Sequence, residues 1–209
     1  MVEKKKNEQP YEGIFEWKTK SICRHLLYEG CDMVGALKIV GSTYRNRTHR
    51  NFMNEANRQV AFGIMIEFYE IMSAQVQIWP MFGTLLGLIR DGGLIPHDDD
   101  LDFGYLKKDE VNLISTLDKL HGSYGYEVIR NEFNNLYSID KNGFLIDLYE
   151  YEDIPGEDII YQGHRRCYDL ARDELFPLKK EKFAGYEFNC INDPIKFLER
   201  YYGNWKDPR

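Results

Sequence analysis

Apolar residues in the second quarter of the chain recur with the period of a helix. Between residues 55 and 72 they return at Val60, Ile64, Phe68 and Ile71. This spacing places them on one face of a helix, with polar residues between them. The pattern therefore predicts an amphipathic helix whose apolar stripe packs on a core.

Capping and turn residues divide the rest of the chain into further elements. We expect a strand at 76–79, a helix at 82–90 that opens at Gly83-Thr84 and ends at Gly92-Gly93, and a strand at 101–106. An amphipathic helix at 109–120 (Leu113, Leu117, Leu120), closed by Gly122, and a strand at 126–130 follow. A hairpin at 136–151 turns on Asn142-Gly143, and a last helix runs from Asp193-Pro194 to Tyr202 with Gly203 as its stop. This order predicts a small α+β or mixed α/β domain.

Composition places the chain among folded proteins. Its 209 residues are 43% hydrophobic and 14% aromatic, which is enough for a sizeable core. The net charge of −7 argues against broad nucleic-acid binding, which needs a basic face. No apolar run is long enough for a membrane span, and no signal peptide is evident. The four cysteines lack a C-x-x-C pair and are expected to be reduced thiols of a cytoplasmic protein.

The most unusual stretch is 98–102, Asp-Asp-Asp-Leu-Asp, which holds four carboxylates in five residues. Two unit charges about 4 Å apart repel by roughly 4 kcal/mol at an effective dielectric of about 20. Such a cluster therefore needs solvent, a raised pKa or a cation. Because apolar residues flank it on both sides, it does not look like a solvated charge run. The cluster indicates a divalent metal site.

Strand alternation separates these carboxylates. Asp100 and Asp102 share one face of a strand, Asp98 joins them if the strand begins earlier, and Asp99 then points away. Asp147 stands in an apolar strand, where a charge needs a partner because unpaired burial is costly. We expect adjacent strands to bring Asp147 beside Asp100 and Asp102, where three carboxylates would hold Mg²⁺.

The Gly83-Thr84 step adds a second candidate binding feature. Backbone N–H groups at a helix N-terminus favour anions, and Arg90 adds a bidentate phosphate donor. A metal beside a phosphate-binding helix indicates phosphoryl or nucleotidyl transfer.

Two alternatives for the acidic stretch carry less weight. A calcium loop would need Gly at its sixth position and Glu at its twelfth, where this chain has Phe103 and Asp109. An acidic turn without a metal is the other alternative, and the apolar flanks argue against it.

Several segments together resemble the LicD family, which includes fukutin and fukutin-related protein. The two main blocks are Phe-Gly-Thr-Leu-Leu-Gly-Leu-Ile-Arg at 82–90 and Gly-Leu-Ile-Pro-His-Asp-Asp-Asp-Leu-Asp at 93–102. Further matching segments are Phe-Leu-Ile-Asp-Leu at 144–148, Leu-Phe-Pro-Leu-Lys-Lys at 175–180 and Tyr-Tyr-Gly-Asn-Trp at 201–205. The resemblance covers residues 55–209, with the motifs in the expected order.

The resemblance implies a nucleotidyltransferase-like fold of the polymerase-beta type, with a central mixed or antiparallel sheet flanked by helices. It implies transfer of a phospho-alcohol, such as phosphocholine or ribitol phosphate, from a CDP-linked donor to a sugar hydroxyl, with release of CMP. Mg²⁺ or Mn²⁺ would be the cofactor. The acceptor would be a glycan or glycolipid of the cell surface, such as lipopolysaccharide or teichoic acid.

The resemblance also implies roles for the acidic residues. Asp100 and Asp102 would hold the metal, with Asp98 as a further candidate ligand. Asp147 would be either a third ligand or the general base for the acceptor hydroxyl.

A second set of residues is expected to bind the donor. Gly83, Thr84 and Arg90 would hold its diphosphate, while Lys179 and Lys180 either contact a phosphate or are exposed lysines beside a turn. His97 stands where family members commonly carry Trp. It is either a polar replacement at the pocket edge or a donor to a phosphate or a proton.

The expected organisation is a disordered tail at 1–10, an N-terminal extension at 11–54, mainly helical or irregular, and a catalytic domain at 55–209. Without the membrane anchor of the Golgi relatives, the bacterial cytoplasm or the inner face of its membrane is the expected location. Two other functions stay open. One is a nucleotidyltransferase that attaches NMP and releases pyrophosphate, and the other is a nucleotide-binding or scaffold protein without turnover.

Overall fold

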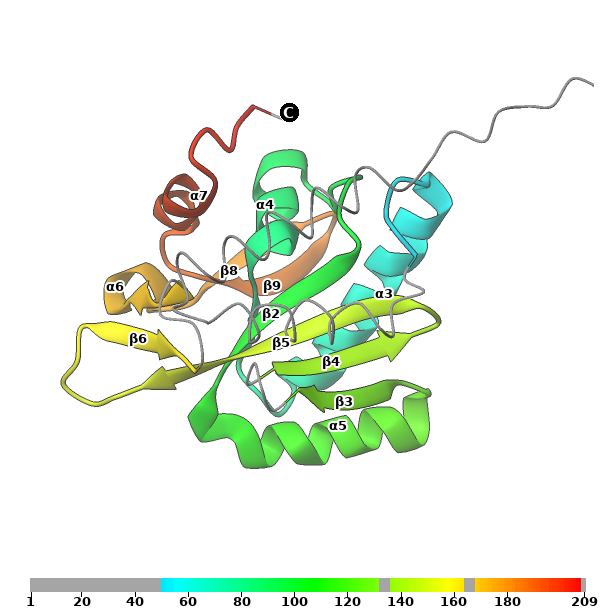
Figure 1. The fold of residues 1–209 in the computed structure, drawn as a ribbon, viewed down its shortest axis with the longest axis horizontal. Coiled ribbons are helices and arrows are strands. Elements are labelled where there is room, and N and C mark those ends of the chain that lie inside the picture. The colour runs from blue at the N-terminus through cyan, green and yellow to red at the C-terminus, as the bar shows by residue number, and fades with distance from the viewer. Residues whose placement is uncertain (1–49, 132–135, 164–167, 208–209) are drawn as a thin grey trace, which may run out of the picture. The chain divides into compact units, whose positions relative to one another are not determined.

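The computed structural model describes residues 50–131, 136–163 and 168–207, which belong to one compact unit, residues 48–209 (Figure 1). The expected tail and nearly all of the expected N-terminal extension lie outside these residues. The described helices and strands form the mixed α/β arrangement that the sequence predicts. Among them, no helix is long and apolar enough to cross a membrane.

A seven-stranded mixed sheet forms the centre of this unit. Its main strands lie in the order β1 (Ile78–Pro80), β2 (Asp100–Leu106), β5 (Phe144–Asp153), β4 (Leu136–Lys141) and β3 (Glu127–Asn131). β6 (Ile159–Gln162) pairs with the last residues of β5, and β7 (Leu170–Ala171) pairs with β6. β2 and β5 run parallel, whereas the other pairs are antiparallel.

The connection between β2 and β5 explains their parallel pairing. It consists of the short helix η1 (Lys107–Asp109), the helix α5 (Glu110–Tyr124), and then β3 and β4. A parallel pair needs such a crossover, and α5 supplies it. The hairpin then turns on Asn142 (φ 57°) and Gly143 (φ 84°), as the sequence predicts, and places Lys141 opposite Phe144.

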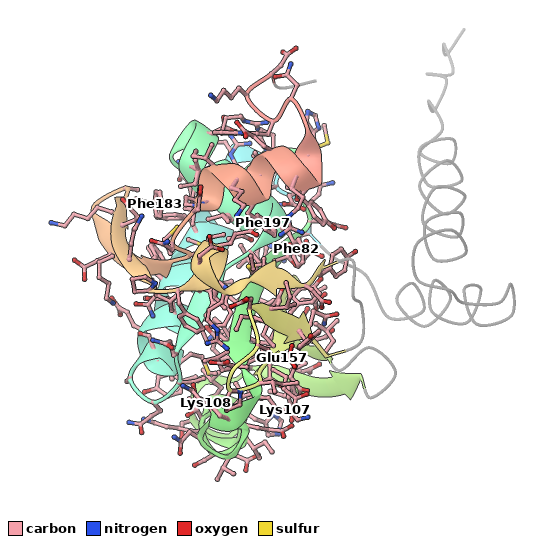
Figure 2. All side chains as sticks on the ribbon, turned by 90° about the vertical axis from the view of Figure 1, so that its left-hand side faces the viewer. Phe82, Lys107, Lys108, Glu157, Phe183 and Phe197 are labelled. Carbon is pink, nitrogen blue, oxygen red and sulfur yellow. The ribbon has the colours of Figure 1, made fainter. Side chains whose placement is uncertain are left out.

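Helices cover both faces of the sheet. α3 (Glu55–Ser73) and α5 pack on one face, against buried side chains of β2, β4 and β5. α4 (Phe82–Asp91) and α7 (Pro194–Tyr202) contribute to a second core on the other face, where Phe82 lies near Phe197 (Figure 2). α6 (Arg172–Leu175) adds Leu175 to this second core.

A separate hairpin of β8 (Lys179–Phe183) and β9 (Tyr186–Cys190) is attached beside β1. The side-chain amide of Asn189 donates to the carbonyl oxygen of Ile78 at 3.0 Å. The backbone N–H of Asn189 donates to the hydroxyl of Tyr69 on α3. These bonds tie the hairpin to both the sheet and a helix.

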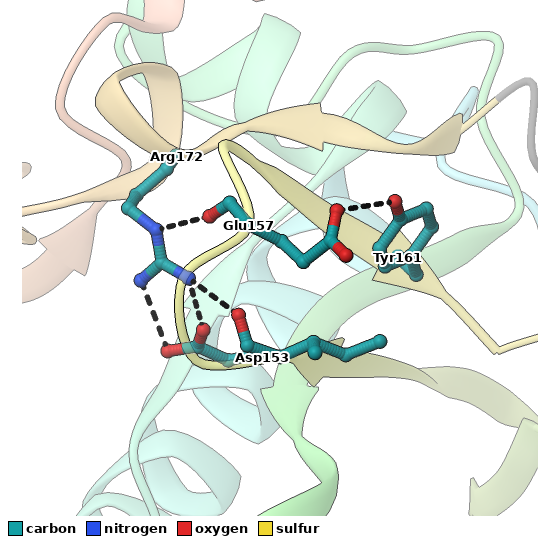
Figure 3. A network of polar contacts seen from close by, with 5 residues as sticks. Asp153, Glu157, Tyr161 and Arg172 are labelled. Atoms are coloured by element: carbon teal, nitrogen blue, oxygen red, sulfur yellow. Dashed lines mark hydrogen bonds and ion pairs between the residues drawn. The ribbon is translucent and has the colours of Figure 1, made fainter.

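Hydrogen bonds and an ion pair of Arg172 stabilise the turn between β5 and β6 (Figure 3). Its Nε donates to the carbonyl oxygen of Glu157 at 2.8 Å, and its Nη atoms pair with the carboxylate of Asp153. The Tyr161 hydroxyl donates to the Glu157 carboxylate at 3.1 Å. This network lies on the outer part of the sheet.

Three details of the predicted elements are wrong. β1 begins at Ile78 instead of Val76, because the N–H of Val76 bonds back to Met72 at the end of α3. α5 continues through Gly122 and ends at the left-handed Gly125 (φ 71°). Val60 is 50% exposed, because the buried stripe of α3 falls on Ala61, Ile64, Met65, Phe68, Tyr69 and Met72.

Candidate active site

Three carboxylates meet on the face of the sheet that α4 covers. In the parallel register, Asp102 of β2 lies directly opposite Asp147 of β5. One carboxylate oxygen from each of Asp100, Asp102 and Asp147 lies within 4.8 Å of the others. Asp102 and Asp147 are buried, with 6% and 2% of their surface exposed. The structure therefore brings together the three acids that the sequence pattern selects.

Strand alternation explains why two adjacent strands can carry this site. Leu101 and Phe103 alternate with Asp102, and Ile146 and Leu148 alternate with Asp147. These four apolar side chains are buried in the core beneath α3 and α5. The acids consequently point to the other face of the sheet.

Two hydroxyl groups fix the positions of the central acids. The Oγ1 atom of Thr84 accepts a hydrogen bond from the N–H of Asp102 at 2.8 Å, which ties α4 to β2. The hydroxyl of Ser138 on β4 donates to Oδ1 of Asp147 at 2.7 Å.

The sequence analysis does not include Ser138 among the candidate site residues, although the turn of the hairpin could have indicated it. A two-residue turn at 142–143 fixes the hairpin register, and that register places Ser138 opposite Asp147.

Asp98 extends the acidic group toward α4. Asp98, Asp99 and Asp100 form a second cluster of carboxylates, in which Asp99 is exposed. A Cβ atom on Gly83 would lie 2.0 Å from Oδ2 of Asp98, so this approach requires glycine at position 83. Burial, followed by the charge of Asp99, raises the pKa of Asp98 to about 6.

Mutual repulsion characterises the centre of the site. Burial raises the pKa of the Asp100 carboxyl well above its usual range, and the charges of Asp102, Asp98 and Asp147 raise it further. A divalent cation would relieve this repulsion, and carboxylate oxygens are ligands that Mg²⁺ and Mn²⁺ accept. The donor set thus fits a hard divalent metal.

The first turn of α4 lies beside the acids and has an unusual backbone. Phe82 begins the helix with a φ of 44°, a left-handed value that is uncommon for a bulky residue. Its ring packs on those of Tyr149, Tyr168 and Tyr201 at centroid distances of 4.9–5.1 Å. Backbone strain of this kind tends to persist where packing enforces it, often at functional sites.

The other residues expected to bind the donor have partners away from the acids. Arg90, in the last turn of α4, donates to the carboxylate of Asp91 at 2.8 Å (Nε) and 2.7 Å (Nη2), and to the carbonyl oxygen of Trp205 at 3.5 Å. The hydrogen bond to Asp91 raises the pKa of Arg90.

The two lysines and the histidine that were expected to bind the donor are exposed on the surface. Lys179 donates to the carbonyl oxygen of Asn192 at 2.7 Å, and the Lys180 ammonium lies 3.9 Å from the Glu187 carboxylate. Both lysines are exposed on β8. His97 is exposed in the turn before β2.

Comparison with known families identifies the domain. The model for "LicD/FKTN/FKRP, nucleotidyltransferase domain" matches residues 75–193, more than half of the chain. The chain belongs to the LicD family. The matched region contains the first turn of α4, the acids of β2 and Asp147 of β5.

Individual relatives extend this assignment. Uncharacterized protein RT0683 of Rickettsia typhi is 32% identical over 146 residues, which cover 69% of this chain and 46% of that protein. Human ribitol 5-phosphate transferase FKRP is 27% identical over 143 residues, which cover 63% of this chain and 28% of FKRP. The chain thus spans about half or less of the length of these relatives.

A solved structure is also similar to this LicD domain. The crystal structure of ANT(2'')-Ia in complex with adenylyl-2''-tobramycin has 13% sequence identity and a TM-score of 0.45, over 64% of this chain and 69% of that one.

Proposed function

We propose that this LicD-family protein is a metal-dependent transferase. It moves a phospho-alcohol, such as phosphocholine or ribitol phosphate, from a CDP-linked donor to a sugar hydroxyl of a cell-surface glycan or glycolipid, and it releases CMP. The observation that carries the proposal is the register of β2 and β5, which juxtaposes Asp102 and Asp147 within the family's nucleotidyltransferase domain. The similarity to a ribitol 5-phosphate transferase supports the same reaction class.

The acidic group would hold Mg²⁺ or Mn²⁺. Asp100 and Asp102 would be its ligands, with Asp98 as a further candidate. Asp147 is close enough to be a third ligand, which is the alternative to its role as general base. When bound, such a cation neutralises charge on the donor phosphates. This assignment accounts for the buried carboxylates that otherwise repel one another.

The chain's own groups would carry the proton transfer. The acceptor hydroxyl oxygen forms a bond to the phosphorus that bears the alcohol, and the bond from this phosphorus to the CMP oxygen breaks. The electron pair of that bond leaves with CMP. The acceptor proton passes to the carboxylate of Asp147, which the Ser138 hydroxyl orients through Oδ1.

The donor diphosphate would lie against the first turn of α4. The N–H groups of Gly83 and Thr84 belong to that first turn, where a helix leaves its own donors unused. Arg90, His97, Lys179 and Lys180 are the proposed outer contacts. Arg90 and Lys179 would exchange Asp91 and the Asn192 carbonyl for phosphate on donor binding.

The decisive experiment is product analysis. Purified protein is incubated with Mg²⁺, glycan acceptors, and CDP-choline or CDP-ribitol, and nucleotide products are separated by chromatography. The proposal predicts CMP that depends on both acceptor and metal. If CMP never appears with any donor and acceptor pair, the proposal is wrong.

The same assay separates the alternatives. Supplying CTP or ATP with an acceptor and measuring pyrophosphate tests for an NMP-attaching enzyme, to which the family description of a nucleotidyltransferase domain also applies. Nucleotide binding without either product would indicate a binding or scaffold protein.

We also propose that the reaction takes place in the bacterial cytoplasm or at the inner face of the membrane. The similarity to a Rickettsia protein supports a bacterial setting.

A further inference from the structure

Two tyrosines near the acidic group, Tyr149 and Tyr202, have no role in the proposed transfer of the phosphoryl group or the proton. We propose that Tyr149 and Tyr202 bind the donor phosphates, with the Tyr149 hydroxyl donating a hydrogen bond to the phosphoryl group that is transferred. This inference rests on the proposed function and adds two contacts to the same site.

Tyr149 stands next to the three acids by strand geometry. It follows Asp147 by two positions on β5 and therefore shares its face of the sheet. In the parallel register it lies opposite Gly104, two positions beyond the pair of Asp102 and Asp147. The phenol therefore lies beside the Asp102–Asp147 pair, where the transferred phosphoryl would meet the acceptor.

Tyr202 approaches from a different element. It is the last residue of α7 and 37% exposed. Its ring meets that of Tyr201 at 4.8 Å, and Tyr201 contacts Phe82 at 5.1 Å, which places Tyr202 near the first turn of α4. Burial, followed by the charge of Asp102, raises the pKa of Tyr202. The two phenols thus come to the site from different elements, a strand and a helix.

Neither the Tyr149 nor the Tyr202 hydroxyl takes part in a hydrogen bond within the described residues, although the hydroxyls of two core tyrosines do. Tyr105 donates to Glu150 at 3.2 Å and Tyr126 donates to Glu67 at 2.8 Å. Because the ordinary pKa of a phenol is about 10, each hydroxyl carries its proton at neutral pH and can donate a hydrogen bond.

Aromatic packing holds the two rings in place. The Phe82 ring meets Tyr149 edge to face at 4.9 Å, and Tyr201 meets Tyr202 in the same way at 4.8 Å. Phe82 also contacts Tyr201 at 5.1 Å, so one cluster supports both tyrosines. Donors fixed before the substrate arrives stabilise developing charge most effectively.

A phosphate is the ligand that suits these donors. Phosphate oxygens not bound to metal need hydrogen-bond donors, and a phenol supplies one next to carboxylates. The phenols would add neutral donors next to the acids, whereas Arg90 and Lys179 would be outer contacts that must first leave Asp91 and the Asn192 carbonyl.

Calorimetric binding of CDP and CMP in the presence of Mg²⁺ tests this proposal. Tyr149→Phe keeps the ring and removes only the hydroxyl. It should weaken CDP binding by about 10- to 100-fold, the range for a hydrogen bond to a charged group, and leave CMP binding unchanged, because CMP lacks the second phosphate. The double variant Y149F/Y202F should weaken CDP binding further.

Tyr161→Phe is the matched control, since it removes a hydroxyl that bonds to Glu157 at the turn between β5 and β6. It should bind CDP like the wild type. Mn²⁺ affinity, measured by electron paramagnetic resonance, should be the same in Y149F and wild type, which separates a phosphate contact from damage to the metal site.

The outcomes distinguish the two levels of the argument. If wild-type protein binds CDP and releases CMP, but Y149F binds CDP equally well, the role of Tyr149 is wrong and the proposed function stands. If the wild type binds neither nucleotide and turns over no CDP-alcohol, the proposed function fails, and this inference fails with it. A loss of Mn²⁺ affinity in Y149F would also overturn the assignment.

Discussion

Asp147 and Glu174 are equally buried, at 2% exposure, but their surroundings differ. Glu174 accepts a hydrogen bond at 2.8 Å from the guanidinium of Arg200. Asp147 accepts one from the neutral Ser138 hydroxyl and lies within 4.8 Å of two further carboxylates. One acid is balanced by a cation of the chain, while the other adds to a concentration of negative charge.

This difference separates a structural acid from a candidate catalytic one. A buried ion pair contributes little net stability, but removing one partner is costly because the other charge stays behind. A group of like charges lowers stability and persists where a ligand relieves it. We therefore expect opposite changes in stability when each carboxylate is replaced by an amide: a gain at Asp147 and a loss at Glu174.

The largest expected effect follows from Asp147→Asn. Turnover should fall about 1000-fold or more, roughly 4 kcal/mol of transition-state stabilisation, because the amide cannot accept the acceptor's proton. In EDTA the variant should unfold at a higher temperature than the wild type, because one repelling charge is gone. CMP release and thermal denaturation measure the two effects.

Asp118→Asn is the control for this variant, because Asp118 is an exposed acid on α5. It should change neither quantity appreciably. Retained turnover in D147N would remove Asp147 from the proposed reaction.

The next largest effect is a pH dependence of the stability of the metal-free protein. The pKa of Asp98 is about 6 in the folded state against 3.8 for the free side chain, so folding favours its protonated form. Its contribution to stability is fully present below about pH 3.8 and is lost as the pH rises through 6. The loss should amount to about 2–3 kcal/mol at most. Urea denaturation in EDTA between pH 4 and 7 measures it.

Asp98→Asn supplies the reference for that measurement. Other groups also titrate in this range, so the quantity of interest is the difference between wild type and variant. The free energy of unfolding of the variant should rise relative to that of the wild type as the pH rises from 4 to 7. A difference that stays constant over this range would contradict the raised pKa of Asp98.

The smallest effect belongs to Glu174→Gln. The substitution leaves the Arg200 guanidinium without its carboxylate, and Arg200 is 40% exposed, so water replaces part of the interaction. We expect a loss of about 1–2 kcal/mol in the free energy of unfolding, with CMP release at 25 °C nearly unchanged. Should E174Q abolish turnover while remaining folded, the contrast between the two acids would not hold.

Much of the fold follows from local sequence. The period of two in β2 and the turn residues Asn142-Gly143 predict their elements because burial and backbone conformation are decided locally there. β8 and β9 escaped prediction, since Lys-Lys-Glu-Lys in β8 lacks an apolar face. These strands depend on tertiary contacts, such as the bonds of Asn189.

The candidate site divides in the same way. The acids could be selected because a carboxylate in an apolar strand is unusual in any context. The sequence could not predict that Arg90 bonds to Asp91 and to the carbonyl oxygen of Trp205, away from the acids. These contacts depend on where α4 ends relative to the C-terminal segment. Tyr202 lies in the motif at 201–205, where the sequence favours packing of the last helix over substrate contact. Tyr149 carries no signal among the 15 tyrosines of the chain until the fold places it beside the acids.

The pairing of Asp102 with Asp147 also has a consequence for biosynthesis. These residues are 45 positions apart, and their strands become neighbours only when the whole crossover through α5 and the hairpin has closed. Closing such a loop costs entropy before the native contacts compensate for it. On the ribosome the complete acidic group cannot form until β5 has left the exit tunnel, so the proposed metal site would be completed late, together with the tertiary structure.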